Sequence, residues 1–224
     1  MEYYLDTARI ADIKHCSEFY PLSGVTTNPS LIAKENRDFW TILKDIRDVI
    51  GPDRMLFAQT VQKSADGIVK EAKLLNERAG GNFGVKIPIG EEGLKATMAL
   101  KKAGIPVLMT AIFTPAQALI SARAGAGYVA PYVNRLDNIS GSGAEVVAEI
   151  AELFALYDLP CKVLAASFKN VEQVARCAAA GCHCVTLSAD LLKAVISHPM
   201  TDAAVAGFER DWKSVYGEKT VMEL

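Results

Sequence analysis

The sequence lacks several features that would place it in other classes of protein. No apolar run approaches the roughly 18 residues that a membrane-spanning helix needs, and the first residues lack a signal peptide's basic start and apolar core. There is no block of basic residues, and the formal net charge is −2. Nucleic acid and membranes are therefore not expected partners, and we expect a soluble, cytoplasmic protein.

Cysteine is scarce, and its spacing does not suggest a metal site. The five cysteines show no C-x-x-C pair. Cys182, His183 and Cys184 resemble a ligand group, but consecutive residues of a strand point to opposite faces and do not easily converge on one ion. We predict buried thiols, because free cysteine behaves as a small hydrophobe. The cysteines are Cys16, Cys161, Cys177, Cys182 and Cys184.

Apolar residues make up 50% of the 224 residues, enough to fill the core of one α/β barrel. Short apolar runs alternate with longer amphipathic stretches, which is typical of a parallel sheet covered by helices. The predicted strands are 3–5, 24–26, 55–59, 84–87, 107–110, 128–130, 162–166 and 183–186. The clearest predicted helices are 39–50, 65–78, 92–103, 115–124, 143–157, 171–180 and 191–196.

Eight strands alternating with helices predict a single (β/α)8 barrel over residues 1–224. The alternative is a doubly wound open sheet, but its usual glycine loop is absent after the first strand, at residues 6–9. An additional amphipathic helix is predicted at about 199–216. We expect its Phe208 and Trp212 to pack either on the barrel or on a neighbouring subunit.

Lys86 is the residue that a structural role explains least well. Residues 83–88 form an apolar run that ends in proline, and alternation places Gly84 and Lys86 on one face of the strand. A lysine near a strand end can extend to water. In a buried strand, however, loss of hydration disfavours an ammonium. A neutral lysine amine can attack a carbonyl and form a Schiff base.

Polar residues follow all but the last of the predicted strands, at the carboxyl ends where barrel active sites lie. Individually they have structural explanations: Asp6 as a helix cap, Asn28 as a turn residue and Tyr132 as a core aromatic with a solvated tip. Gln59 and Thr110 would satisfy backbone groups. The set comprises Asp6, Thr26, Asn28, Gln59, Lys86, Thr110, Tyr132, Asn134, Arg135, Ser167 and Lys169.

Together these groups contain the parts of a Schiff-base aldol reaction. Lys86 would attack a ketone, and Asp6 is the nearest candidate carboxylate for general acid/base catalysis. Arg135 and Ser167, which also fit a capping or surface ion-pair role, offer a guanidinium and a hydroxyl to a phosphate. The groups predicted to hold a catalytic water are Gln59, Thr110 and Tyr132.

Several segments resemble the transaldolase family over nearly the whole chain. The strings TTNPS at 26–30 and VKIP at 85–88, in this order, are highly specific. The resemblance is greatest to the short subgroup that includes fructose-6-phosphate aldolase. The matching segments are LDT at 5–7, GVTTNPS at 24–30, LFAQ at 56–59, VKIP at 85–88, APYVNR at 130–135 and AASFK at 165–169.

The resemblance implies a (β/α)8 barrel whose fourth strand carries the Schiff-base lysine, Lys86, with Asp6 as the acid/base. It implies no metal and no organic cofactor, because the lysine itself acts as the electron sink. A ring-like homo-oligomer is also implied, and a decamer is the expected size. The substrate-binding residues that it implies are Thr26 and Asn28 for dihydroxyacetone and Arg135 and Ser167 for the phosphate.

Two reactions occur in families of this type. The aldolase cleaves fructose 6-phosphate to dihydroxyacetone and glyceraldehyde 3-phosphate. A transaldolase of the pentose phosphate pathway transfers dihydroxyacetone units between sugar phosphates such as sedoheptulose 7-phosphate and erythrose 4-phosphate. Gln59 and Tyr132 fit the aldolases, since transaldolases carry glutamate and phenylalanine there, whereas Phe113 fits the transaldolases. We predict an aldolase, with the transaldolase as the alternative.

Two further hypotheses are less consistent with the sequence. A barrel that binds sugar phosphates without turnover would have no need of Lys86 and Asp6, and both are present. A lysine aldolase of the deoxyribose-phosphate type is disfavoured by the motif at 26–30.

Overall fold

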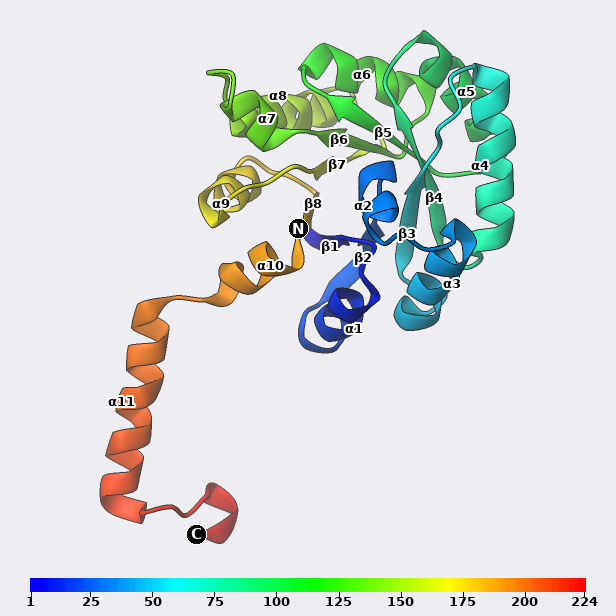
Figure 1. The fold of residues 1–224 in the computed structure, drawn as a ribbon. Coiled ribbons are helices and arrows are strands. Elements are labelled where there is room, and N and C mark those ends of the chain that lie inside the picture. The colour runs from blue at the N-terminus through cyan, green and yellow to red at the C-terminus, as the bar shows by residue number, and fades with distance from the viewer.

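The structure is a computed structural model that describes residues 1–224, and eight parallel strands close into a barrel in the order β1 to β8. Figure 1 shows the strands with the helices arranged around them. The predicted (β/α)8 barrel is confirmed, and the open-sheet alternative is wrong. The strands are β1 (Glu2–Asp6), β2 (Leu22–Thr26), β3 (Met55–Gln59), β4 (Phe83–Pro88), β5 (Val107–Ile112), β6 (Tyr128–Pro131), β7 (Lys162–Ala165) and β8 (Cys184–Leu187).

The helices follow the strands along the chain, and most of them begin at a polar cap. Thr114 and Gln117, for example, form a capping box at the start of α6, with proline in its first turn. The helices are α1 (Ile10–Phe19), α2 (Pro29–Lys34), α3 (Phe39–Ile50), α4 (Ala65–Ala79), α5 (Glu91–Lys102), α6 (Pro115–Ala124), α7 (Val133–Asp137), α8 (Gly143–Leu156), α9 (Val171–Ala179), α10 (Ala189–Ile196) and α11 (Pro199–Tyr216), followed by the 3-10 turn η1 (Val221–Glu223).

Three helices were not among those predicted, and each has a weak sequence pattern. The first, α1, buries only Ile13 and Cys16. The other two, α2 and α7, are short segments of six and five residues that follow β2 and β6 directly. A second difference is the eighth strand, which runs from Cys184 to Leu187, one residue later than predicted. These differences leave the barrel order unchanged.

The core has two parts, one on each side of the sheet. A cluster of 44 buried residues lies between the strands and the helices. A smaller cluster inside the barrel contains Tyr4, Phe57 and Leu108, and the rings of Phe57 and Tyr128 lie 5.2 Å apart. At the amino-terminal ends of the strands, Lys162 forms an ion pair with Glu2. All five cysteines are buried and unpaired, as predicted.

Close packing inside the barrel requires glycine at two inward positions. A Cβ atom on Gly24 would lie 2.0 Å from the carbonyl oxygen of Met55. At Gly84, directly before the Val85–Lys86 pair, a Cβ atom would lie 2.3 Å from the ring of Phe57. A strand backbone or a packed ring cannot move far enough to relieve such contacts. The two glycines therefore allow the strands and the Phe57 ring to pack closely.

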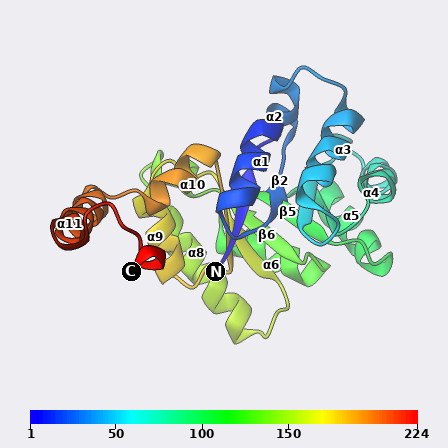
Figure 2. The ribbon, with the colours of Figure 1, turned by 90° about the horizontal axis from the view of Figure 1, so that it is seen from below.

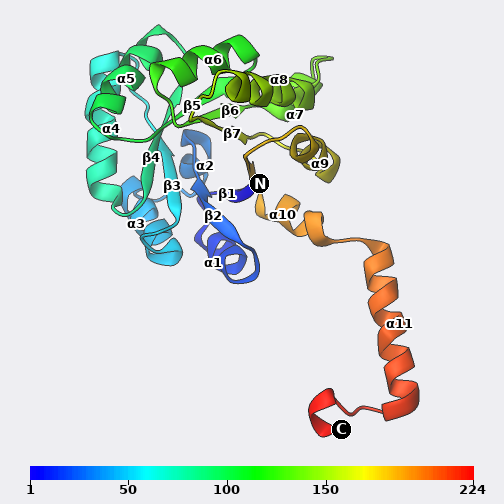
Figure 3. The ribbon, with the colours of Figure 1, turned by 180° about the vertical axis from the view of Figure 1, so that it is seen from behind.

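The C-terminal helix α11 lies apart from the barrel. Figures 1 and 3 show it extending away from the strands beyond α10, and the view in Figure 2 shows the same separation. None of its residues is buried, and Phe208 is 72% exposed. Trp212 stacks on Tyr216 with ring centroids 4.6 Å apart. The helix therefore does not cover its own barrel, and packing on a neighbouring subunit stays a prediction. None of the helices has the length and apolar character of a membrane span.

Candidate active site

Lys86 points into the barrel from β4. Its side chain is buried, with 4% exposure, so it does not extend to bulk water. In the sheet it pairs with Gln59 of β3 and Leu108 of β5. Lys86 takes part in none of the salt bridges of the structure. The amine is thus held inside the barrel without a direct anionic partner.

Asp6 ends β1 and lies within electrostatic range of Lys86. Burial raises the pKa of Asp6, while the charge of Lys86 and a hydrogen bond from Thr26 partly offset this increase. The hydroxyl of Thr26 donates to Asp6 Oδ1 at 2.7 Å. Asp6 is not the cap of α1, because that helix begins after Arg9 without a side-chain cap. The carboxyl group is therefore free to face the lysine.

Tyr132 lies at the carboxyl end of β6, between polar and aromatic neighbours. Its hydroxyl is 3.0 Å from Thr110 Oγ1, so Thr110 contacts a side chain rather than the backbone group suggested by its structural explanation. The ring meets Phe113 edge-on at 5.5 Å, and the guanidinium of Arg135 lies 4.8 Å from the ring centroid. Ala111, between Thr110 and Phe113, has a positive φ of 58°. This local irregularity of β5 resembles the bulges found beside active sites.

Arg135 and Ser167 come from neighbouring segments. The backbone N–H of Asn134 donates to the carbonyl oxygen of Ser167 at 2.8 Å, which joins the start of α7 to the segment that follows β7. Ser167 has a φ of 62° and is half-buried, whereas Arg135 is exposed. Strain at a non-glycine residue often accompanies a functional position. A solvated guanidinium and a hydroxyl at one rim are suited to an anionic ligand.

Asn28 caps α2, in line with its structural explanation. Its side-chain oxygen accepts the backbone N–H of Leu31 at 3.0 Å. Since this oxygen is engaged, the amide N–H₂ remains as the donor for a ligand. The binding role of Asn28 stays a prediction.

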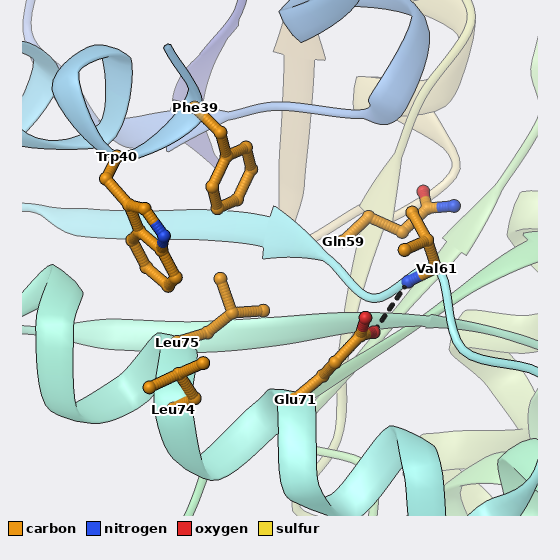
Figure 4. A pocket seen from close by; sticks show the side chains of 7 residues that line it. All are labelled: Phe39, Trp40, Gln59, Val61, Glu71, Leu74 and Leu75. Atoms are coloured by element: carbon orange, nitrogen blue, oxygen red, sulfur yellow. Dashed lines mark hydrogen bonds between the residues drawn. The ribbon is translucent and has the colours of Figure 1, made fainter.

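Gln59 lies at the end of β3, beside an apolar pocket that the sequence did not reveal. Figure 4 shows Phe39 and Trp40 of α3 facing Leu75 of α4 across this pocket, whose volume is about 270 Å³. The carboxylate of Glu71 accepts the backbone N–H of Val61 at 2.8 Å and so fixes the loop after β3. The full lining consists of Phe39, Trp40, Gln59, Val61, Glu71, Leu74 and Leu75.

Thr186 is a polar residue of the barrel interior that was not predicted as part of the site. It is buried on β8, and its Oγ1 lies 2.7 Å from Thr26 Oγ1. The available signal was a hydroxyl between Val185 and Leu187, two apolar residues that point the other way. As the last residue of a predicted apolar strand, Thr186 did not by itself indicate a site.

A closed parallel barrel that encloses a lysine, with a carboxyl group and several hydroxyls beside it, is typical of Schiff-base enzymes of the aldolase and transaldolase type. Residues 3–220 match the family described as "Transaldolase/Fructose-6-phosphate aldolase". The chain therefore belongs to this family, as the sequence motifs predict.

Solved structures show the same fold at low sequence identity. A mutant flavocytochrome b2 with benzoylformate aligns with a TM-score of 0.61 and 14% identity, over 84% of this chain and 57% of that one. A native KDPGal structure aligns with a TM-score of 0.57 and 18% identity, over 95% and 93% of the two chains. A designed cube-shaped protein cage made by fusing symmetric oligomeric domains aligns at 0.60 and 16%, over 96% and 77%. These likenesses support the barrel fold alone.

Proposed function

We propose that the protein is a Schiff-base aldolase that reversibly cleaves fructose 6-phosphate to dihydroxyacetone and glyceraldehyde 3-phosphate. The observation that carries this proposal is the hydroxyl pair of Tyr132 and Thr110, 3.0 Å apart at the mouth of the barrel that holds Lys86. Gln59 pairs with Lys86 in the sheet and has no ionisable group. Such a polar, non-acidic setting suits a water that releases the lysine-bound fragment.

In the proposed reaction, Lys86 Nζ attacks the C2 carbonyl of the ketose, and loss of water forms a protonated Schiff base. Asp6 takes the proton from the C4 hydroxyl. The C3–C4 bond then breaks, the aldehyde leaves, and the electron pair moves to the Schiff base to form an enamine. Protonation of that enamine at carbon and hydrolysis release dihydroxyacetone and regenerate Lys86.

The phosphate of the substrate is assigned to the rim formed by Arg135 and Ser167. Arg135 is exposed and already oriented by its contact with the Tyr132 ring, which reduces the side-chain freedom lost on binding. Thr26 and Asn28 are assigned to the dihydroxyacetone part. The five unpaired thiols fit a reducing compartment, and we place the enzyme in the cytoplasm.

The test is the release of glyceraldehyde 3-phosphate from fructose 6-phosphate, with and without erythrose 4-phosphate. An aldolase sustains release without an acceptor, because water replaces it. Release that stops after one turnover and resumes with erythrose 4-phosphate would establish the alternative, a transaldolase. Phe113, which packs directly on Tyr132, is the residue that favours this alternative.

Tyr132→Phe should shift the activity from release towards transfer. Removal of one hydroxyl that holds a water is expected to reduce release relative to transfer by about three- to tenfold, the range of one hydrogen bond. The ratio of free dihydroxyacetone to transfer product, measured with a fixed acceptor concentration, checks this result. Tyr157→Phe, on the outer surface, is the matched control. An unchanged ratio would exclude Tyr132 as the discriminating residue.

We also propose that the chain forms a homo-oligomer in which α11 of one copy packs on the barrel of the next. Val205, Phe208 and Val215 are spaced along one face of α11, and each is more than half exposed. The barrel offers the uncovered apolar pocket beside Phe39 and Trp40. Light scattering is expected to give a multiple of the 24.1 kDa chain mass, with a decamer as the predicted size. A stable monomer at micromolar concentration would contradict this.

A further inference from the structure

Thr186 forms the end of a hydrogen-bonded chain that leads to Asp6. Its Oγ1 lies 2.7 Å from Thr26 Oγ1, and the Thr26 hydroxyl donates to Asp6 Oδ1 at 2.7 Å. Both threonines are buried, with exposures of 3% and 0%. A hydroxyl has a single proton. When Thr26 donates to Asp6, Thr186 is therefore the donor to Thr26.

We propose that Thr186 is a positioning residue that orients the Thr26 hydroxyl towards Asp6 and supports Asp6 in both of its protonation states. With Asp6 ionised, protons point from Thr186 to Thr26 to Asp6. With Asp6 protonated, the chain reverses: Asp6 donates to Thr26, and Thr26 donates to Thr186. The inference rests on the proposed function only for the acid/base task of Asp6.

Few charged groups other than Lys86 lie near Asp6. The positive charge of Lys86 on β4 acts to lower the pKa of Asp6. The neighbouring strand β2 has no titratable side chain, and the thiol of Cys184 on β8 donates to Glu2 at the opposite end of the barrel. Asp190 and Lys193 of α10, which packs on β1, are exposed.

The expected shift of the pH profile depends on which protonation state of Asp6 the Thr186 hydroxyl stabilises more. A hydrogen bond to a carboxylate is stronger than one to a neutral carboxyl group, and a second donor polarises the first and strengthens it. Loss of the Thr186 hydroxyl should therefore weaken the ionised state more. The acidic limb of the kcat/KM profile should move to higher pH.

The experiment compares Thr186→Val, Thr186→Ala and Thr186→Ser in the full-length enzyme. The two variants without a hydroxyl should lose about three- to tenfold in kcat, the range of one hydrogen bond, with little change in KM. Their acidic limb should move upward, and Thr186→Ser should restore both values. If the folded valine or alanine variant keeps the wild-type kcat and pH profile, the proposal is overturned.

A second measurement separates this proposal from the proposed function. The Asp6 carboxyl can be titrated directly by NMR of ¹³C-labelled aspartate, with Asp6→Asn to assign its signal. An upward shift in the valine variant, reversed by serine, supports the hydrogen-bonded chain even if fructose 6-phosphate is not cleaved. No shift in either variant without a hydroxyl overturns it, whatever the substrate proves to be.

Discussion

Lys86→Met should abolish cleavage of fructose 6-phosphate while the barrel remains folded. Methionine has nearly the same length as lysine but no amine, so it cannot form the covalent intermediate on which the whole reaction depends. Its apolar side chain also suits the surroundings of Lys86, which is 4% exposed and forms no salt bridge. Unfolding should therefore occur at or above the wild-type temperature.

Borohydride trapping connects this loss of activity to its cause. Reduction in the presence of dihydroxyacetone should add one ketone-derived fragment to the wild-type chain and nothing to Lys86→Met. The control is Lys102→Met, at the exposed end of α5. This variant should form the reduced adduct and cleave the substrate like the wild type. Turnover by Lys86→Met near the wild-type rate, or trapping at another lysine, would exclude the assigned role.

Asp6→Asn is expected to reduce kcat by about 10²- to 10⁴-fold, the usual contribution of a positioned general acid/base. Asparagine keeps an oxygen that can accept the Thr26 hydrogen bond, so the geometry is largely preserved. The stability should not decrease at neutral pH. Burial raises the pKa of Asp6, so ionisation of this side chain lowers the stability of the folded state. This loss of stability develops as the pH rises through the folded-state pKa.

The comparison requires both kinetics and thermal unfolding at pH 7. Asp53→Asn, in the exposed turn before β3, is the matched control and should change neither value. Full activity of Asp6→Asn would mean that another group moves the proton. A lower unfolding temperature would instead show that the carboxylate stabilises the barrel, contrary to the direction of its pKa.

The barrel was predictable because its strands and helices differ strongly in pattern. Short runs of mostly apolar residues, such as β4, alternate with helices such as α3, whose Ile42, Leu43, Ile46 and Ile50 form one buried face. The site residues were found as polar exceptions at strand ends, and the structure brings Asp6 and Thr26 together and Thr110 next to Tyr132. Periodicity locates strand ends, and closure of the barrel brings them close in space.

Other features depended on contacts that no local pattern encodes. Thr186 reads as an ordinary strand residue until the closed barrel places it beside Thr26. The pocket beside Gln59 forms only because Phe39 and Trp40 of α3 meet Leu74 and Leu75 of α4. The position of α11 was equally inaccessible, since its amphipathic sequence fits a barrel and a neighbouring chain equally well.

A layer of aromatic side chains closes the barrel interior on the amino-terminal side of Lys86. Tyr4, Phe57 and Tyr128 fill the barrel interior towards the amino-terminal ends of the strands. The ring centroids of Tyr4 and Phe57 are 6.0 Å apart, and those of Phe57 and Tyr128 are 5.2 Å apart. Any molecule that reaches the lysine must use the opposite entrance, and so must anything that leaves it. The aldehyde fragment has to depart before water or another aldehyde can take its place, so the aldehyde is expected to be the first product released and dihydroxyacetone the second. When an aldehyde acceptor is added, transfer to it should show parallel-line kinetics.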